Sequence, residues 1–405
     1  MLIMKIVRQN RMKEESNMGK SFLILIFVFL VLALTVGSAN AVTGQCSGCH
    51  TMHDSQDGAN IGAAGAQGQL LNSGCAGCHT GTHDGDGKNS FGSPVVLDGA
   101  DPTGQGVGVT NAGGDFWWVE NTDDAKGHNV TEISGNADGT IGDTPPGWDP
   151  DATSGHAFGQ VAGGEANWTS QLTCAGTYGC HGVRTQANGL LAISTSHHNN
   201  ADTGGGVSAT SASTADTIAN SFRFLGGIKG LENVGWNWAE TTSAHNEYYG
   251  KNDVDAERDD DTTDTYANSD TMSYFCAQCH GFFHSRVVAS GAGISSPWVR
   301  HPTDIVLPNS GEFDDYNSDN GDDTEGAYSL SVPVARGAVA TNAQGSRSTV
   351  IAGDSTTVDG AIVMCLTCHR AHGSPEDDML RFTYTDMIIG SSDTTGCFVC
   401  HTDKN

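Results

Sequence analysis

The chain has 405 residues, of which 19 are Lys or Arg and 47 are Asp or Glu, so its formal net charge is −28. So large an excess of negative charge argues against binding to nucleic acid or to an anionic lipid surface. Only 37% of the residues are hydrophobic and 54 are glycine, which is little apolar material for an ordinary core in a chain of this length. A compact fold of this composition needs another source of buried apolar surface.

The first 41 residues have the pattern of a secretory signal. Residues 1–20 include five basic side chains, an almost unbroken apolar run extends from Phe22 to Val36, and small residues lead up to Ala41. We expect cleavage after Ala41, because the apolar run is shorter than the about 20 residues that span a bilayer. An uncleaved N-terminal anchor is the alternative, and Met18 is a second candidate for the start of the leader. Residues 42–405 are then expected to form one domain, with no membrane span after cleavage.

Six cysteine motifs follow the leader, and we number them one to six in chain order. Five read Cys-x-x-Cys-His, beginning at Cys46, Cys75, Cys276, Cys365 and Cys397. This is the attachment signature of c-type haem, because each thiol adds to one vinyl group and the adjacent imidazole ligates the iron. A zinc or disulfide framework is the alternative, although zinc patterns do not place His directly after every cysteine pair. The motifs use all twelve cysteines: Cys46 and Cys49, Cys75 and Cys78, Cys174 and Cys180, Cys276 and Cys279, Cys365 and Cys368, and Cys397 and Cys400.

Motif three is stretched, since it reads CAGTYGCH from Cys174 to His181 and has five residues between the thiols. We expect it to hold a sixth haem, with the extra residues looped out and Cys180 still directly before His181. A Cys174–Cys180 disulfide without haem is the alternative.

Six haems would supply the apolar bulk that the composition lacks. We therefore expect a mostly irregular, loop-rich fold with short helices that carry the motifs and with little β structure, organised around its six haems. The apoprotein should be unfolded or molten, because cofactor ligation and burial replace ordinary packing.

The histidine count bears on the chemistry. Each motif provides one axial ligand, and ten of the sixteen histidines remain for the other axial positions. A haem with two imidazoles has no open position for substrate, so it transfers electrons and does not catalyse a reaction at the iron. Nothing in the sequence suggests a catalytic acid or base, and we expect no enzyme. The motif ligands are His50, His79, His181, His280, His369 and His401.

Four of the other histidines follow a motif histidine by three or four residues: His53, His83, His284 and His372. On a continuing helix these offsets put both imidazoles on one face, so the second one can reach a neighbouring haem. The full set of candidates is His53, His83, His128, His156, His197, His198, His245, His284, His301 and His372.

These motifs resemble the OmcS-type extracellular cytochromes, whose hexahaem subunits polymerise into filaments. The resemblance rests on CSGCHTMHDS, GGDFWWV with KGHNV, FRFLGG, FCAQCHGFFH, RHP, CLTCHRAHG with MLRF, and CFVCHTDKN. It implies ligation by two histidines throughout, stacked and perpendicular haem pairs in alternation, and His128 and His301 as distal ligands. It also implies that His53 crosses to the haem at His369 of the adjacent subunit. Motif three departs from the family pattern, which makes His197 or His198 the substitute ligand there.

The leading hypothesis is therefore a secreted cytochrome that transfers electrons along a conductive filament to extracellular acceptors or other cytochromes. A soluble periplasmic electron carrier is the second hypothesis and a multihaem reductase the third. The expected distal ligands are His53, His83, His128, His198, His284, His301 and His372.

Overall fold

The computed structural model divides the chain into two units, and all residues that it describes belong to the second, Ala41–Asn405. The described residues are 46–51, 53, 55–56, 59–60, 70–71, 73–83, 87–104, 109–133, 137–148, 168, 170–193, 218, 221–231, 241–243, 245–252, 270–280, 283, 301–313, 316, 326–338, 347–391 and 394–404. In this part of the chain, no helix is both long and apolar enough to cross a membrane.

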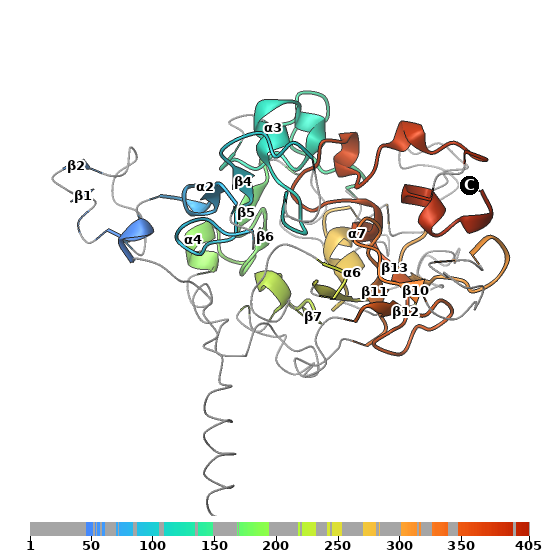
Figure 1. Cartoon of the computed structure of the whole chain (residues 1–405). Helices are drawn as coiled ribbons and strands as arrows, with labels where there is room; N and C mark the ends of the chain where they lie inside the picture. Colours follow the sequence, from blue (N-terminus) through green and yellow to red (C-terminus); the bar gives the residue numbers. More distant parts are fainter. Residues whose placement is uncertain are drawn as a thin grey trace, which may run out of the picture. The chain divides into compact units, whose positions relative to one another are not determined.

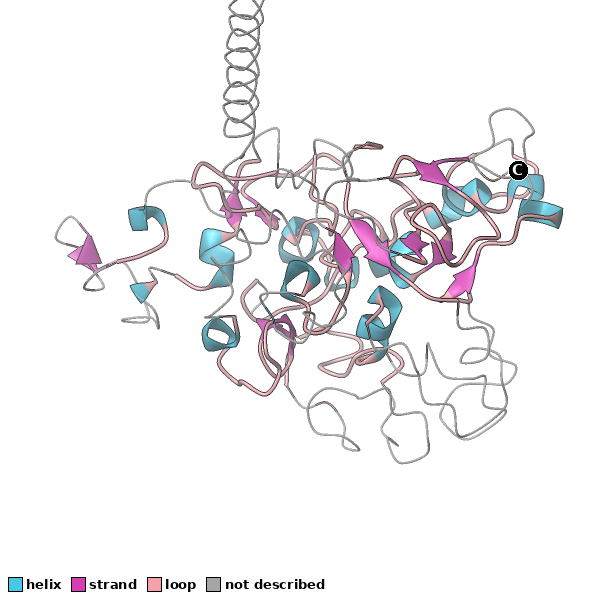
Figure 2. Cartoon of the chain, turned by 90° about the horizontal axis from the view of Figure 1, so that it is seen from below, coloured by secondary structure: helices cyan, strands magenta, loops and turns pink. Residues whose placement is uncertain are grey.

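Short elements joined by loops make up the described fold, as the sequence predicts (Figures 1 and 2). The α-helices are α2 (Cys75–Cys78), α3 (Trp117–Asn121), α4 (Gly189–Ala192), α6 (Met272–Ala277) and α7 (Cys365–Cys368). The 3-10 turns are η1 (Cys46–Gly48), η3 (Asp124–Lys126), η6 (Phe222–Phe224), η8 (Gly311–Phe313), η9 (Asp377–Met379), η10 (Tyr384–Asp386), η11 (Gly396–Val399) and η12 (Thr402–Lys404).

The strands have two or three residues each. Four two-stranded pairs are β1 (Ser55–Gln56) with β2 (Ala59–Asn60), β3 (Thr80–Gly81) with β4 (Leu97–Asp98), β5 (Thr173–Ala175) with β6 (Gly179–His181), and β10 (Gly326–Ala327) with β12 (Thr349–Val350). A five-stranded sheet has the order β7 (Gly230–Leu231), β8 (Glu247–Tyr249), β11 (Ala335–Arg336), β13 (Ile362–Val363) and β9 (Ile305–Val306). The composition did not predict this sheet.

The five-stranded sheet is mixed. Strand β8 runs antiparallel to β7 and parallel to β11, with Tyr248 opposite Ala335 in the second pair. Strand β13 is antiparallel to both of its neighbours, and Ile362 lies opposite Ala335 on one side and Val306 on the other. The sheet therefore joins segments that are far apart in the sequence.

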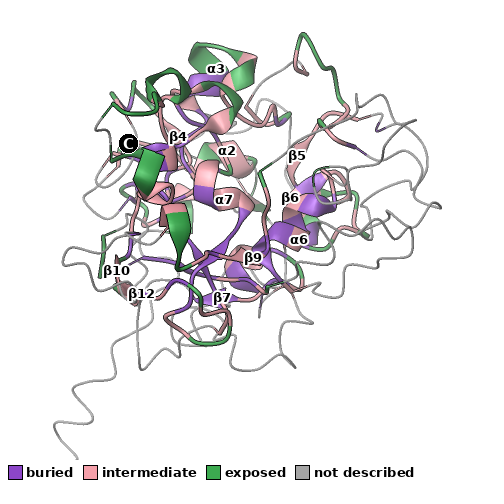
Figure 3. Cartoon of the chain, turned by 90° about the vertical axis from the view of Figure 1, so that its right-hand side faces the viewer, coloured by how far each residue is buried: buried purple, intermediate pink, exposed green. Residues whose placement is uncertain are grey.

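The two faces of this sheet belong to two hydrophobic clusters. Successive strand residues point to opposite faces, and accordingly Ile362 packs in one cluster and Val363 in the other. The first cluster includes Met272 and Phe275 of α6, and Figure 3 shows buried residues gathered at this helix. Strand β13 is followed at once by Met364 and α7, so the sheet fixes the position of motif five.

A buried ion pair lies within the same sheet. The Arg336 Nε on β11 donates to Glu247 Oε2 on β8 at 2.9 Å, and both side chains are fully buried. Glu247 also accepts from the His245 ring at 3.1 Å. Because an unpaired charge in such a place would be very unfavourable, these three residues must be ordered together.

Candidate functional site

The five intact motifs share one backbone turn. In each, the N–H of the motif histidine donates to the carbonyl oxygen of the first cysteine, at 2.8 Å from His50 to Cys46 and 3.1 Å from His369 to Cys365. Residues three and four positions apart on such a turn share a face, so the two thiols and the imidazole project from one side of the chain. The turn belongs to α2, α6 and α7 in motifs two, four and five, and to η1 and η11 in motifs one and six.

Motif three is built differently, from β5 and β6 instead of a helical turn. The loop between the strands is closed by bonds from Gly179 N to Gly176 O at 2.9 Å and from Gly176 N to His181 O at 3.1 Å. Gly176 has φ +95°, a conformation that favours glycine. Cys174 and Cys180 are both free thiols, and Cys180 stays directly before His181. The expectation that short helices carry the motifs is wrong for this one, because the extra residues form a tight loop between two short parallel strands.

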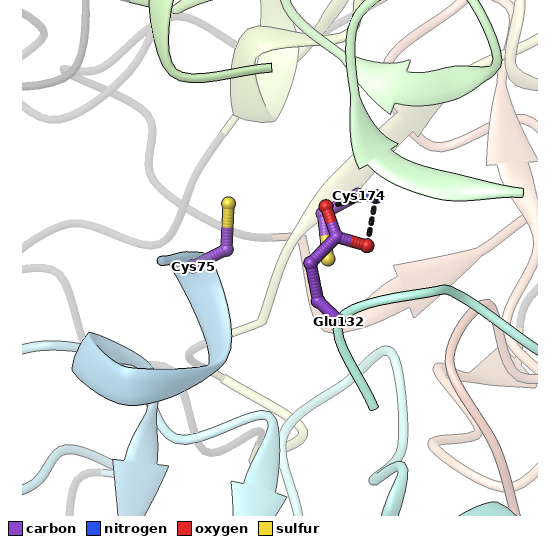
Figure 4. Close-up of side chains that lie close together, drawn as sticks. All are labelled: Cys75, Glu132 and Cys174. Atoms are coloured by element: carbon purple, nitrogen blue, oxygen red, sulfur yellow. Dashed lines mark hydrogen bonds between the residues drawn. The ribbon is translucent and has the colours of Figure 1, made fainter. Parts of the chain in front are cut away.

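The thiols of consecutive motifs are neighbours in the first half of the chain. Cys49 of motif one lies within hydrogen-bonding range of Cys78 of motif two. Cys75 of motif two lies in the same way beside Cys174 of motif three, next to Glu132 (Figure 4). Both carboxylate oxygens of Glu132 accept the Cys174 backbone N–H at 3.2 Å. Cys75, Glu132 and Cys174 could also hold a metal ion, but their thiols belong to the haem motifs.

The same order continues in the second half. Cys180 of motif three interacts electrostatically with Cys279 of motif four. Helix α6, which carries the first cysteine of motif four, packs on α7 of motif five. Cys368 of motif five interacts with Cys400 of motif six. The six motifs thus succeed one another in space in the order of the sequence, and we call this arrangement the motif row.

Burial raises the pKa of six of these thiols and so favours their protonated form. It raises the pKa of Cys279 and Cys400 to about 12 and the pKa of Cys49 and Cys368 to about 11. A thiol is nucleophilic as its thiolate, so these side chains are poor redox or catalytic groups in the folded chain. Their burial fits covalent attachment to a large apolar cofactor.

Six of the candidate iron ligands have a tautomer that is fixed by a backbone carbonyl. Carbonyl oxygens can only accept, so a ring nitrogen bonded to one carries the proton, and the lone pair is then on the other nitrogen. Ligand histidines in metalloproteins typically donate their second N–H in this way. In each of these six histidines the Nδ1–H donates to a backbone carbonyl oxygen. The donor and acceptor residues are His79 and Pro94 (2.9 Å), His128 and Ala371 (2.8 Å), His181 and Arg223 (2.9 Å), His280 and Pro146 (2.7 Å), His301 and Pro302 (3.0 Å), and His369 and Asp378 (2.7 Å).

Two pairs of imidazoles have the centroid separation expected of two axial ligands of one iron. The ring centroids of His128 and His280 are 6.2 Å apart, and those of His301 and His401 are 6.1 Å apart. An iron bound at about 2 Å from a nitrogen of each ring would put the centroids about 6 Å apart. Each pair joins a motif histidine to one expected distal ligand. The thiols, the neutral imidazoles and this spacing fit haem c, which supplies an iron that gains and loses one electron.

Comparison with known proteins agrees with this chemistry. Residues 358–405 match the family model described as the doubled CXXCH motif. The C-type cytochrome OmcS of Geobacter sulfurreducens (strain ATCC 51573 / DSM 12127 / PCA) is 28% identical over 406 residues, which cover 89% of this chain and 84% of OmcS. This chain is a multihaem c-type cytochrome. The resemblance to OmcS that its motifs suggest is confirmed, and its haems are covalently bound.

Two solved structures are also similar to this cytochrome. One is described as a cryo-EM structure of the OmcS nanowires from Geobacter sulfurreducens and is 22% identical, with a TM-score of 0.41. The other is an Outer Membrane Cytochrome S filament from the same organism and is 20% identical, with a TM-score of 0.40. Each match covers 85% of this chain and 85% of the solved chain.

The other expected distal ligands of the cytochrome lie in several environments. His372 is half-buried with its Nδ1 shielded from solvent, stacks on Phe116 with ring centroids 4.8 Å apart, and interacts with His181. Burial lowers the pKa of His372 to about 3, so it is neutral, as a ligand must be. Burial likewise lowers the pKa of four further ligand candidates, His79, His128, His181 and His301.

His83 and His53 differ from these. The His83 Nε2 lies 3.8 Å from Asp98 Oδ2 and 3.8 Å from Asp115 Oδ2, and these three residues could hold a metal ion. His53 is exposed, and its backbone N–H bonds to the Thr51 hydroxyl at 3.4 Å. An exposed imidazole beside motif one can contact another molecule.

His245 has a structural environment. Its Nδ1 bonds to Thr241 O at 3.1 Å and its Nε2 to Glu247 Oε1 at 3.1 Å, and its ring stacks on Tyr328 with centroids 3.7 Å apart. Both ring nitrogens are therefore used within the protein. Of the remaining candidates, His156, His197, His198 and His284 lie outside the described residues.

One residue at the cytochrome's sites was not expected from the sequence. The Nδ1 of His401 donates to the carboxylate of Glu312 at 3.1 Å. Lys404 bonds to the other oxygen of Glu312, and this bond holds the pKa of Glu312 below its ordinary value. Glu312 and His401 are far apart in the sequence, and no motif links them.

Proposed function

We propose that this cytochrome carries electrons outside the cell, through six haems that are each ligated by two histidines, along filaments built from many copies of the chain. The electrons would pass to extracellular acceptors or to other cytochromes. The observation that carries the proposal is the motif row, since it provides a continuous path for electrons from one end of the chain to the other.

Axial ligation supports electron transfer rather than catalysis. The pairs His128 with His280 and His301 with His401 would each fill both axial positions of an iron and exclude substrate. His372 is the best candidate for the iron at His181, because its imidazole interacts with that residue and its Nδ1 is shielded from solvent. We keep His83, His198 and His284 as further proposed ligands. The protein then holds the irons at fixed spacing, excludes water and sets their potentials.

The contacts between motifs support the path. Haems attached to neighbouring thiols, such as Cys49 and Cys78 or Cys180 and Cys279, would have their edges close together. Electrons would move by single steps between neighbours, and no step needs a proton donor or acceptor from the chain.

Polymerisation is supported by sequence similarity and by His53. OmcS, to which this chain is similar in sequence, is described as forming nanowires. The exposed His53 side chain can extend away from its own subunit and ligate the haem at His369 of the next copy, as the resemblance implies. Such a filament would dissociate slowly, because removal of a subunit leaves one iron without a ligand. Secretion through the leader of residues 1–41 would place the filament outside the cell.

The test is negative-stain electron microscopy of the holoprotein sheared from cells, beside His53→Ala. We expect filaments from the natural chain and discrete particles from the variant. His53→Met is the matched variant, since Met can also ligate haem iron, and it should restore short filaments. Discrete particles from the natural chain would refute the filament and favour a soluble periplasmic carrier. Filaments that persist in His53→Ala would refute the role of His53.

A further inference from the structure

The last motif of the row has a distinctive hydrogen-bond partner. Among the motif histidines whose Nδ1 bond the structure describes, His79, His181, His280 and His369 donate to backbone carbonyls. His401 donates instead to the Glu312 carboxylate at 3.1 Å. The acceptor is therefore charged at motif six and neutral at the other four.

The contact is held by two short turns. Glu312 lies in η8 and Lys404 in η12, and these turns pack against each other. The Thr402 hydroxyl donates to the Glu312 carbonyl at 3.1 Å, and the Lys404 ammonium lies 2.9 Å from Glu312 Oε2. The carboxylate thus bridges the imidazole and the ammonium, one on each oxygen. These contacts hold the carboxylate against the His401 ring, although 31% of the Glu312 side chain is exposed.

A carboxylate acceptor changes the electron-donating strength of a ligating imidazole. It draws the Nδ1 proton toward itself, which raises the basicity of the Nε2 lone pair and favours the ferric iron over the ferrous iron. Second-shell hydrogen bonds of this kind are one of the means by which a protein sets a haem potential. The ammonium of Lys404 opposes the effect, because it draws electron density to the other oxygen.

We propose that Glu312 is a positioning residue that lowers the reduction potential of the haem at Cys397 and Cys400, and that Lys404 limits this lowering. The inference rests on the proposed axial role of His401. Reduction adds one electron to the iron, the proton stays on Nδ1, and no bond is broken. A lower potential makes the last haem of the motif row a stronger electron donor once it is reduced.

The test is a spectroelectrochemical titration of the holoprotein and of Glu312→Gln. Gln keeps a hydrogen-bond acceptor and removes the charge. We expect one of the six haems to become about tenfold easier to reduce, which is 59 mV for one electron, while the other five are unchanged. Lys404→Gln should shift the same haem in the opposite direction, and should do so less when Glu312→Gln is already present. Electron paramagnetic resonance should show one altered low-spin ferric signal.

Asp403→Asn is the matched control, because Asp403 is exposed in the same turn η12 and has the same charge. A shift in Glu312→Gln no larger than in Asp403→Asn would overturn the proposal. A high-spin signal in Glu312→Gln would also overturn it, since the carboxylate would then hold the ring on the iron. If His401→Ala leaves all six haems low-spin, the axial assignment fails instead. None of these readouts requires filaments.

Discussion

Replacement of Arg336 by Met tests whether the five-stranded sheet supports the haem sites. The guanidinium is fully buried and makes five hydrogen bonds, one to Glu247 and four to backbone carbonyls. Met has a similar length but no donors. The variant therefore removes the guanidinium from the Glu247 carboxylate, which keeps only the His245 ring and the Arg347 backbone N–H as partners, and it leaves carbonyl groups that have lost their donor.

The expected cost is large. Removal of one partner of a buried ion pair typically costs about 3 to 5 kcal/mol, because the remaining charge stays out of water. The whole free energy of unfolding of a domain is typically about 5 to 15 kcal/mol. We therefore expect Arg336→Met to lose about a fifth or more of the free energy of unfolding. Since β13 leads directly into α7, the loss should include the haem environment of motif five.

Guanidinium unfolding of the holoprotein, followed by far-ultraviolet circular dichroism and by haem absorbance, measures this cost. Arg347→Met is the control, because the Arg347 side chain is 34% exposed and pairs with Asp359 at 2.8 Å. An exposed pair of this kind contributes about 1 kcal/mol or less. Glu247→Gln in addition to Arg336→Met should recover part of the loss. Equal unfolding midpoints for Arg336→Met and Arg347→Met would refute this account of the buried pair.

Three further predictions concern the haems. His128→Ala should leave one axial position of one iron vacant, so the reduced variant should bind one carbon monoxide per chain, whereas His245→Ala should bind none. Equal binding by the two variants would refute His128 as an axial ligand. Cys174→Ala should still retain six haems by intact mass, through single attachment at Cys180, and loss of one haem would show that motif three needs both thiols. Because the pKa of His372 is about 3 when folded and ordinarily about 6.5, the unfolded chain takes up its proton first as the pH falls. Stability should therefore be full above pH 6.5 and decrease below it, by about 2 kcal/mol at pH 5 for this group, and an unfolding midpoint that is constant from pH 7 to 5 would contradict this.

The sequence predicted the loop-rich fold but not the five-stranded sheet. The strands contain only two or three residues, which is too short for alternation to stand out. Pairs such as Ile362 with Ala335 join distant segments and depend on tertiary packing. The buried Arg336 was equally unpredictable, because a lone arginine in a loop-rich sequence normally indicates the surface.

The attachment motifs were predictable because their chemistry is local. The spacing of the cysteines and the histidine in the sequence directly predicts two thiols and one imidazole on a single turn, as at Cys365 and His369. The pairing of His128 with His280 could not be predicted from the sequence, because the two residues lie on separate loops and only the fold brings them together. The Glu312 contact to His401 leaves no trace in the sequence for the same reason.

The agreement between spatial order and chain order in the motif row has a consequence for assembly. No later motif has to be inserted between two earlier ones, so the molecule can be completed by addition at one end, starting from Cys46. Each newly attached haem can then pack against the haem attached before it, as the neighbouring thiols of Cys75 and Cys174 indicate. A chain that stops after motif four should therefore be a shorter row, in which the haem at His181 lacks its proposed distal ligand, His372.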